Sequence, residues 1–135
     1  MIAFDTNVLL RLLLDDDETQ SGQVEAIVRQ VAEAGDRILL PDIVLCELYW
    51  VLRSVYEFAK ADIVTTFRRL LTAEEFAFVD RRAVSQSLES YANGSAGFSD
   101  YLIGHSATAA GATTTYTLDR ALRRTVGFSH PAPVR

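Results

Sequence analysis

The chain has 135 residues, of which 49% are hydrophobic, and its formal net charge at pH 7 is −5. This length and apolar content fit a single globular domain spanning 1–135 and argue against disorder. The acidic balance argues against binding nucleic acid through bulk positive charge alone. Cys46 is the only cysteine, so no internal disulfide is expected. No stretch reads as a signal peptide or a membrane span, and we therefore expect a cytoplasmic protein.

Strand-like and helical segments alternate along the chain, which favours an α/β fold over a helical bundle or a β-sandwich. In the first part the pattern predicts a strand at 2–4, a helix at 8–14, a helix at 21–34, a strand at 37–40 and then a helix opened by Pro41. The acidic run 15–18 is expected to be a solvated loop that caps the second of these helices, which Gly35 ends.

The second part continues the alternation. It predicts a helix at 60–71, a strand at 76–79, a helix at 81–92 capped by Asp80, a helix at 100–110 and a β-prone segment at 113–117. Ser99 is the candidate N-cap of the helix at 100–110, and Gly111 closes it. A short helix is expected from Asp119 to Arg124, and the tail after it is expected to hold one edge strand.

Glu47 is the most informative residue of the chain. On a helix its neighbours on the same face are Ile43, Val44, Trp50 and Val51, all of them apolar. The pattern therefore predicts a carboxylate that points inward. Such a group is costly to bury unless it is paired or binds a metal, and the sequence offers no obvious cation on that face.

Three further acids occupy places where a ligand site is expected. Asp5 follows the first strand and Asp119 a later one, and ligand sites of open α/β sheets lie at the carboxyl ends of strands. Asp100 opens a helix after a loop that contains glycine. Each of these acids could instead serve as a helix cap or as a favourable charge near the helix dipole.

Gathering these acids with Glu47 would require a compensating charge. Two carboxylates about 4 Å apart repel each other by roughly 4 kcal/mol at an effective dielectric constant near 20. A divalent ion provides the compensation, and an all-oxygen site suits Mg²⁺ or Mn²⁺ better than zinc. Nearby polar groups are expected to orient a carboxylate, a water or a phosphate, and these are Thr6, Asn7 and Thr117. Arg11 and Arg120 are candidate phosphate contacts, with a solubilising helix face as the alternative.

Four motifs in order give the chain a family resemblance. They are Asp-Thr-Asn-Val-Leu-Leu at 5–10, Pro-Asp-Ile-Val-Leu-Cys-Glu at 41–47, Phe-Ser-Asp-Tyr-Leu-Ile at 98–103 and Thr-Leu-Asp-Arg-Ala-Leu at 117–122. With these motifs the chain resembles the PIN-domain ribonucleases, and in particular the VapC-type toxins of bacterial toxin–antitoxin pairs. The resemblance covers almost the whole chain. Leu118 departs from it, because many members have an aromatic residue there.

The resemblance implies a three-layer α/β/α fold with a central, mainly parallel sheet. It implies that Asp5, Glu47, Asp100 and Asp119 form the catalytic metal site, and the hydrolysis that we expect uses one or two Mg²⁺ or Mn²⁺ ions. The implied activity is metal-dependent cleavage of RNA phosphodiester bonds, in tRNA or another structured RNA. The implied inhibitor is a cognate antitoxin whose C-terminal segment wraps the toxin and places an arginine in the acidic pocket.

The helix that carries Glu47 is apolar nearly all round, which is typical of a helix that is deeply buried or in an interface. Aromatic side chains are enriched at interfaces. We therefore expect a homodimer contact or an antitoxin groove that involves Tyr49, Trp50 and Tyr56, with burial beneath another helix as the competing interpretation.

Two other classes of function remain open. The first is a non-catalytic module that binds RNA or protein on the same fold. The second, less favoured, is a phosphatase of the haloacid dehalogenase type, which wants a second aspartate where this chain has Asn7 and a basic residue to hold the phosphoryl group, whereas no lysine occurs before Lys60. Cleavage of DNA is not excluded by the chemistry, because metal-assisted hydrolysis does not itself select ribose.

Overall fold

The computed structural model describes residues 1–14 and 17–134. The chain divides into two compact units, Met1–Arg81 and Arg82–Arg135. Asp15 and Asp16, from the acidic run that was expected to form a loop, lie outside the described residues.

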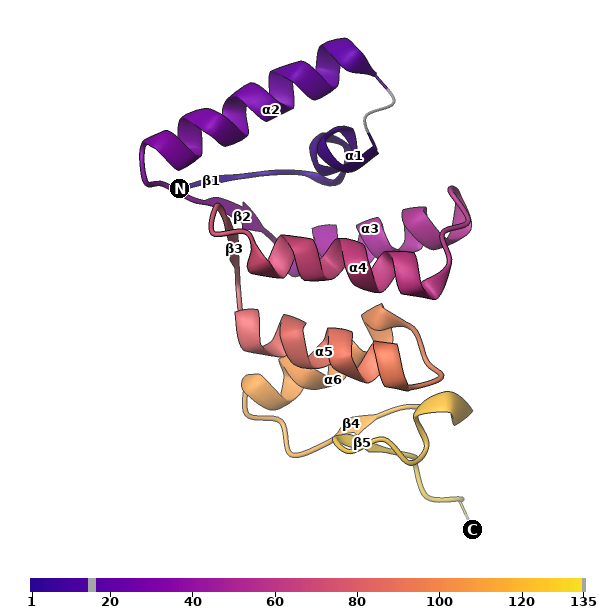
Figure 1. Ribbon diagram of the computed structural model, residues 1–135. Helices are drawn as coiled ribbons and strands as arrows, with labels where there is room; N and C mark the ends of the chain where they lie inside the picture. The colour runs from indigo at the N-terminus through magenta and orange to yellow at the C-terminus, as the bar shows by residue number, and fades with distance from the viewer. Residues whose placement is uncertain (15–16, 135) are drawn as a thin grey trace. The chain divides into compact units, whose positions relative to one another are not determined.

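The first unit is built on a parallel sheet (Figure 1). Its elements follow in the order β1 (Ile2–Ala3), α1 (Thr6–Leu14), α2 (Glu18–Glu33), β2 (Ile38–Leu40), α3 (Asp42–Ser54), α4 (Lys60–Thr72) and β3 (Phe76–Phe78). The strand order is β1-β2-β3, with Ile2 opposite Ile38 and Leu40 opposite Phe78. Because these strands are parallel, their carboxyl ends share one edge of the sheet. Asp5 follows β1 at that edge, and α3 starts from it after β2.

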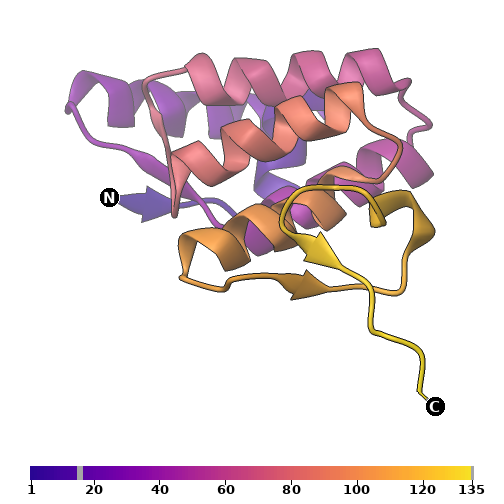
Figure 2. The ribbon, with the colours of Figure 1, turned by 90° about the horizontal axis from the view of Figure 1, so that it is seen from below.

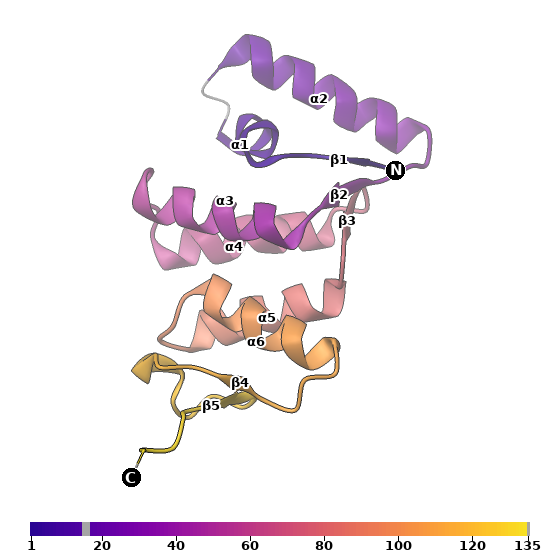
Figure 3. The same cartoon turned by 180° about the vertical axis from the view of Figure 1, so that it is seen from behind.

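The core of the first unit is formed by the central strand and one side of each helix. Helix α1 contacts both α2 and α3, and α3 lies beside α4 (Figures 1 and 3). The side chains with almost no exposed surface are Leu9, Ile38, Leu40, Leu45, Leu48, Leu52, Ile63 and Phe67. Burying one such side chain contributes about 1.5–3 kcal/mol, so this cluster is the main source of stability in the unit.

Local signals define the ends of α2. The Asp17 Oδ1 accepts a hydrogen bond from the backbone N–H of Gln20 at 3.0 Å, so the last aspartate of the acidic run caps this helix as predicted. The helix begins three residues before the predicted start, at Glu18. Gly35 follows it with a φ of +65°, a left-handed conformation that glycine adopts at low cost.

Arg81 closes the first unit. Its guanidinium donates hydrogen bonds to the carbonyl of Leu71, at the end of α4, and to the carbonyl of Phe76 in β3. The same group lies 4.9 Å from the centre of the Phe78 ring, within the range of a cation–π contact. One side chain thus ties the last helix of the unit to its last strand.

The second unit combines two helices with a short two-stranded sheet. Its elements are α5 (Arg81–Asn93), which begins one residue before the unit boundary, α6 (Phe98–Ala109), β4 (Thr115–Tyr116), the 3₁₀ turn η1 (Arg120–Leu122) and β5 (Phe128–Ser129). Strands β4 and β5 pair in parallel, with Thr115 opposite Phe128 (Figure 2). The predicted short helix after Asp119 is therefore a shorter 3₁₀ turn, and the predicted edge strand in the tail is β5.

The start of α6 differs from the prediction. The helix begins at Phe98 with Gly97 as its N-cap, so the assignment of Ser99 as N-cap was wrong. Asp100 is the third residue of the helix, and its Oδ2 accepts the backbone N–H of Gly97 at 3.1 Å. A carboxylate at this position satisfies the backbone N–H of the N-cap residue, and Gly97 itself has no side chain that could cap the helix.

Gly104 sets the packing of α6 against the second sheet. It is buried, and a Cβ added there would lie 2.5 Å from the Phe128 ring of β5. Only the absence of a side chain on this turn of α6 allows that ring to approach the helix so closely.

None of the helices in the described residues combines the length and the apolar character that a membrane span requires.

Candidate active site

Asp5 lies at the junction between β1 and α1, in the first unit. Its side chain is exposed, and Oδ1 accepts the backbone N–H of Val8 at 3.0 Å, which caps the first turn of α1. Thr6, the next residue, is only 9% exposed, and its Oγ1 has no hydrogen-bond partner among the described residues. Leaving a buried hydroxyl unsatisfied costs about 1–3 kcal/mol, so this atom calls for a water or a polar ligand beside Asp5.

Glu47 lies in the middle of α3, and the prediction that it points inward was wrong, because its side chain is exposed. The buried residues of this helix are Val44, Leu45, Leu48, Tyr49 and Leu52. Of the four apolar neighbours of Glu47, Ile43 is 71% exposed and Trp50 is 60% exposed, whereas Val44 is buried and Val51 is half-buried. An apolar residue on each side of an acid therefore did not indicate burial, since this helix is apolar nearly all round.

Asn7 and Arg11 line a pocket between α1 and α2. Asn7 is exposed and Arg11 is half-buried, and the pocket has a volume of about 450 Å³. The Nε of Arg11 donates a hydrogen bond to Gln20 Oε1 at 2.5 Å, and Ser21 Oγ donates to the Arg11 carbonyl at 2.8 Å. The two helices therefore hold the candidate phosphate contact Arg11 in place.

Asp119 lies in the second unit, where β4 gives way to η1. Its exposed carboxylate accepts the backbone N–H of Ala121 at 2.9 Å through Oδ1. Its own backbone N–H donates to Thr117 Oγ1 at 3.0 Å, so this threonine contacts the residue that it was predicted to orient. Arg120, the other candidate phosphate contact, is exposed in η1.

His130 was not selected from the sequence, yet it contacts the same residue. Its Nε2 donates to the Asp119 carbonyl at 3.2 Å. The pairing of β4 with β5 carries the tail back to the end of β4, as shown by the hydrogen bond from Thr117 N to Ser129 O at 2.9 Å. No signal local to His130 predicts this contact, because it depends on a strand pairing between distant segments.

The four candidate acids fall into two pairs. Asp5 and Glu47 belong to the first unit, whereas Asp100, which is half-buried, and Asp119 belong to the second. Across residues 1–14 and 17–134, no three histidine, cysteine or acidic side chains gather closely enough to hold a metal ion. In the same part of the chain, none of the four acids forms an ion pair with a basic side chain.

The chemistry of these residues fits a divalent metal ion. In three of the acids one carboxylate oxygen accepts a hydrogen bond from a backbone N–H. Asp5 accepts from Val8, Asp100 from Gly97 and Asp119 from Ala121. A carboxylate has about four lone-pair positions, so each retains acceptor capacity for a cation. Carboxylate oxygens are the ligands that Mg²⁺ and Mn²⁺ prefer. The unsatisfied hydroxyl of Thr6 adds a polar atom next to Asp5 that could orient a water on such an ion.

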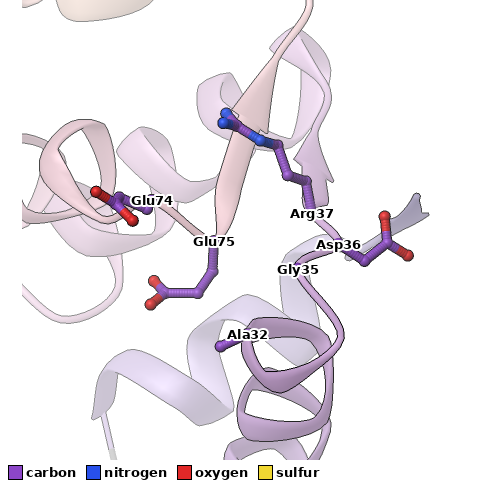
Figure 4. Close-up of a pocket in the computed structure, with 6 residues that line it drawn as sticks. All are labelled: Ala32, Gly35, Asp36, Arg37, Glu74 and Glu75. Carbon is purple, nitrogen blue, oxygen red and sulfur yellow. The ribbon is translucent and has the colours of Figure 1, made fainter.

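A second pocket lies at the opposite end of the first sheet (Figure 4). It is lined by Ala32, Gly35, Asp36, Arg37, Glu74 and Glu75, and it sits where β2 and β3 begin. Figure 4 shows that the carboxylate of Glu75 and the guanidinium of Arg37 point in different directions. Because the pocket lies where β2 and β3 begin, it is separate from the carboxyl ends of the strands, where Asp5 and the start of α3 lie.

The aromatic residues predicted to form an interface separate into two kinds. Tyr49 is only 6% exposed, and its hydroxyl accepts a hydrogen bond from Arg53 Nη1 at 2.9 Å, which makes it a residue of the core. Trp50 is 60% exposed and Tyr56 is 41% exposed. The exposed aromatic surface of this region is thus formed by Trp50 and Tyr56 without Tyr49.

Comparison with known proteins identifies the family. A family model described as PIN domain matches residues 2–127, a range that includes all four candidate acids and extends over both units. No curated protein matches the chain. PIN domains are typically metal-dependent nucleases and generally use divalent ions. The match confirms the predicted PIN-like α/β/α fold class, and the chain belongs to the PIN-domain family.

Proposed function

We propose that this protein is a metal-dependent endoribonuclease toxin that hydrolyses RNA phosphodiester bonds. Asp5, Glu47, Asp100 and Asp119 are its metal-binding and catalytic acids in this proposal. The observation that carries it is that a chain of the PIN family has four acids within the sequence motifs quoted above, none of which forms an ion pair with a basic side chain within the described residues. Acids left in this state are suited to binding a cation.

The proposed cofactor is one or two Mg²⁺ or Mn²⁺ ions. When bound, such an ion lowers the pKa of a water molecule and stabilises negative charge on the phosphate. The chain itself orients the acids. The carboxylate of Asp5 is fixed by the N–H of Val8, and the backbone of Asp119 is fixed by Thr117 and His130. Ordering these groups before the substrate arrives avoids a cost during the reaction.

The polar neighbours have supporting roles in this proposal. Thr6 and Asn7 directly follow Asp5 in the chain, and they orient a water or a phosphate oxygen. Arg11 and Arg120 bind phosphates of the RNA strand, because a guanidinium matches the geometry of phosphate oxygens. The substrate is tRNA or another structured RNA, cleaved where the strand is unpaired, because bases outside a helix can be splayed apart.

The proposed biological role is that of a VapC-type toxin held inactive by a cognate antitoxin in the cytoplasm. The exposed face of α3, with Ile43, Trp50 and the nearby Tyr56, is the proposed contact for the antitoxin or for a second copy of the chain in a homodimer. Apolar and aromatic surface of this kind is typical of interface centres. An antitoxin arginine near the acids would neutralise them and block both metal and substrate.

The test is cleavage of end-labelled RNA, including total tRNA, by purified protein without antitoxin. Reactions contain Mg²⁺, Mn²⁺ or EDTA, and the variant is Asp5→Asn. Asparagine is as good a helix cap as aspartate, so this variant keeps α1 intact while removing the charge. We expect cleavage that requires the metal and is lost in Asp5→Asn. A labelled DNA strand of the same sequence shows whether the enzyme selects ribose.

One result would overturn the proposal. If no RNA is cleaved and thermal stability does not change on adding Mg²⁺ or Mn²⁺, the acids are not a metal site. The protein would then be a binding module on the PIN fold, and RNA binding without cleavage would identify its ligand.

A further inference from the structure

The pocket between α1 and α2 has the features of a ligand site. Its volume of about 450 Å³ lies in the range of roughly 300–1,000 Å³ that is usual for small-molecule sites. The residues that line it are Asn7, Val8, Arg11, Gln20, Gln23 and Val24, all of which belong to the first unit.

The chemistry of this lining is distinctive for an acidic protein. The chain has a net charge of −5, yet the described lining contains one guanidinium, three carboxamides and two valines, and no carboxylate. A carboxamide offers both a donor and an acceptor, which is the combination that reads the edge of a nucleobase. The valines supply apolar contact for the face of a ring, and Arg11 supplies a partner for an anion.

Two of the polar groups of the pocket, those of Arg11 and Gln20, are held in place. Gln20 accepts a hydrogen bond from Arg11 Nε at 2.5 Å, and Ser21, which is 2% exposed, donates to the Arg11 carbonyl at 2.8 Å. With its oxygen engaged by Arg11, the carboxamide of Gln20 retains its N–H groups as donors for a ligand. A site whose groups are already ordered loses less entropy when a ligand binds.

The pocket also lies next to the proposed chemistry along the chain. Asn7 is two residues after Asp5, in the first turn of α1, whose N-terminus Asp5 caps. A strand whose phosphate reaches Asp5 could therefore place an adjoining nucleotide at Asn7.

We propose that this pocket binds one unpaired nucleotide of the RNA substrate beside the cleaved bond. The inference rests on the proposed function and names the part of the enzyme that selects the base. The carboxamides of Gln20 and Gln23 contact the base edge, Val8 and Val24 contact its face, and Arg11 binds the adjoining phosphate. A base must leave its helix to enter, so the pocket favours unpaired segments.

The test compares two matched variants of α2, Gln23→Ala and Gln30→Ala. Both side chains are exposed on the same helix, but only Gln23 lines the pocket. Affinities for single-stranded RNA oligonucleotides that differ in one base are measured by titration calorimetry in the presence of EDTA, which prevents cleavage. We expect Gln23→Ala to lower affinity by about three- to tenfold, as befits one lost hydrogen bond, and to reduce discrimination between bases.

A third variant, Arg11→Lys, tests the phosphate contact. Lysine keeps the charge but loses the planar fork, so affinity should fall for all oligonucleotides, and the preference among bases should fall less than in Gln23→Ala. Side-chain amide signals of Asn7 and Gln23 in NMR spectra should also shift when an oligonucleotide is added. Gln30→Ala should bind and cleave RNA as the unaltered protein does.

Two outcomes would overturn the inference, and they differ from failure of the proposed function. If Gln23→Ala and Gln30→Ala bind RNA equally and both cleave it, the enzyme is a nuclease but the pocket is not its base site. If the Gln23 signals shift only with a protein partner, the pocket is a protein-binding site. Absence of cleavage by the unaltered protein would instead contradict the proposed function. The titration in EDTA would still show whether RNA binds in the pocket.

Discussion

The two units hold their candidate acids in different ways. In the second unit both acids are anchored to backbone N–H groups, Asp100 to that of Gly97 and Asp119 to that of Ala121. In the first unit Asp5 has the same kind of anchor, whereas Glu47 stands in the middle of α3 on an exposed face and caps nothing. Glu47 is therefore the one acid of the four that is proposed to bind a metal without also accepting a hydrogen bond at the start of a helix.

This difference shows why a helix cap and a metal ligand are poor alternatives to each other. One carboxylate oxygen can accept a backbone N–H while the other faces a cation, because the group has several lone pairs. The backbone contact even improves a ligand, since it restricts the rotation of the side chain. The three capping acids can therefore be both structural and functional, and the effects of removing them combine two causes.

The largest expected effect is a loss of RNA cleavage when Glu47 or Asp119 is replaced. Comparing the two residues separates the loss of a metal ligand from the loss of a helix cap. Glu47→Gln should lower RNA cleavage by at least about 100-fold, because a metal ligand contributes several kcal/mol to transition-state stabilisation. Its thermal unfolding should not change, since this exposed side chain caps no helix. Asp119→Ala should lose cleavage and also about 1 kcal/mol of stability with its cap. The measurements are single-turnover cleavage rates and thermal melts of both variants.

Asp119→Asn is the control, because asparagine keeps the cap and removes only the charge. It should melt like the unaltered protein and cleave as poorly as Asp119→Ala. Full cleavage by Glu47→Gln would remove this residue from the proposed site and leave its motif position without a chemical role.

A smaller effect is expected from adding one methyl group to a glycine in each unit. Gly104→Ala should destabilise the second unit by about 1–3 kcal/mol, because the new Cβ would lie 2.5 Å from the Phe128 ring. Gly22→Ala in α2 should instead stabilise the first unit by up to about 1 kcal/mol, because nothing lies within 4 Å of its added Cβ and alanine is the better helix former. Chemical denaturation measures the change in the free energy of unfolding for both variants. Hydrogen exchange of backbone amides then shows in which unit the change occurs.

If Gly104→Ala leaves stability unchanged, β5 is able to move away from α6 at little cost. The double variant Gly104→Ala with Phe128→Leu would show this directly, because a smaller side chain at 128 should relieve the overlap only if the ring is held against the helix.

The smallest expected effect is a pH dependence confined to the second unit. His105 is half-buried, its Nε2 lies 3.0 Å from Ser90 Oγ, and burial lowers the pKa of its imidazole below 6.5. The unfolded chain therefore binds the proton more readily than the folded one. The contribution to stability is complete above the unfolded pKa of 6.5 and is lost as the pH falls from there toward the folded pKa.

Thermal melts between about pH 7.5 and about pH 5 test this dependence, since the interval spans the ordinary titration of histidine. The unaltered protein should melt at a lower temperature at the acidic end. His105→Gln keeps a side chain that can hydrogen-bond Ser90 but does not titrate in this interval, and it should show a weaker dependence. An equal dependence in both proteins would assign the effect to other groups.

The parts of the fold that follow from periodicity were predictable. Helices α2 and α4 were predicted to within a few residues, because each shows a clear apolar stripe, and α2 also has a local stop signal in Gly35. The orientation of α3 was not predictable in the same way. That helix has apolar residues on nearly every side, so the choice between its faces depends on which neighbours cover it, and this is information that a local pattern does not contain.

The candidate site shows the same division. The candidate acids were proposed from the apolar neighbours of Glu47, from positions after strands or after a loop with glycine, and from motifs, and Thr117 was proposed because it is two residues from Asp119. His130 and the α1–α2 pocket were not found, because each depends on segments that meet only in the folded chain, β4 with β5 and α1 with α2. The start of α6 was missed for a smaller reason, since its N-cap is Gly97, which offers no capping side chain, and Asp100 contacts the N–H of Gly97 from within the first turn.

The exposed position of Trp50 has a practical consequence. It is the only tryptophan of the chain, it is 60% exposed, and it lies one helical turn from Glu47. Its intrinsic fluorescence should therefore have the long-wavelength emission of a solvated indole in the isolated chain. Any partner that covers this face of α3 would shift the emission to shorter wavelength, so the protein contains its own optical reporter for events beside Glu47 and needs no attached dye.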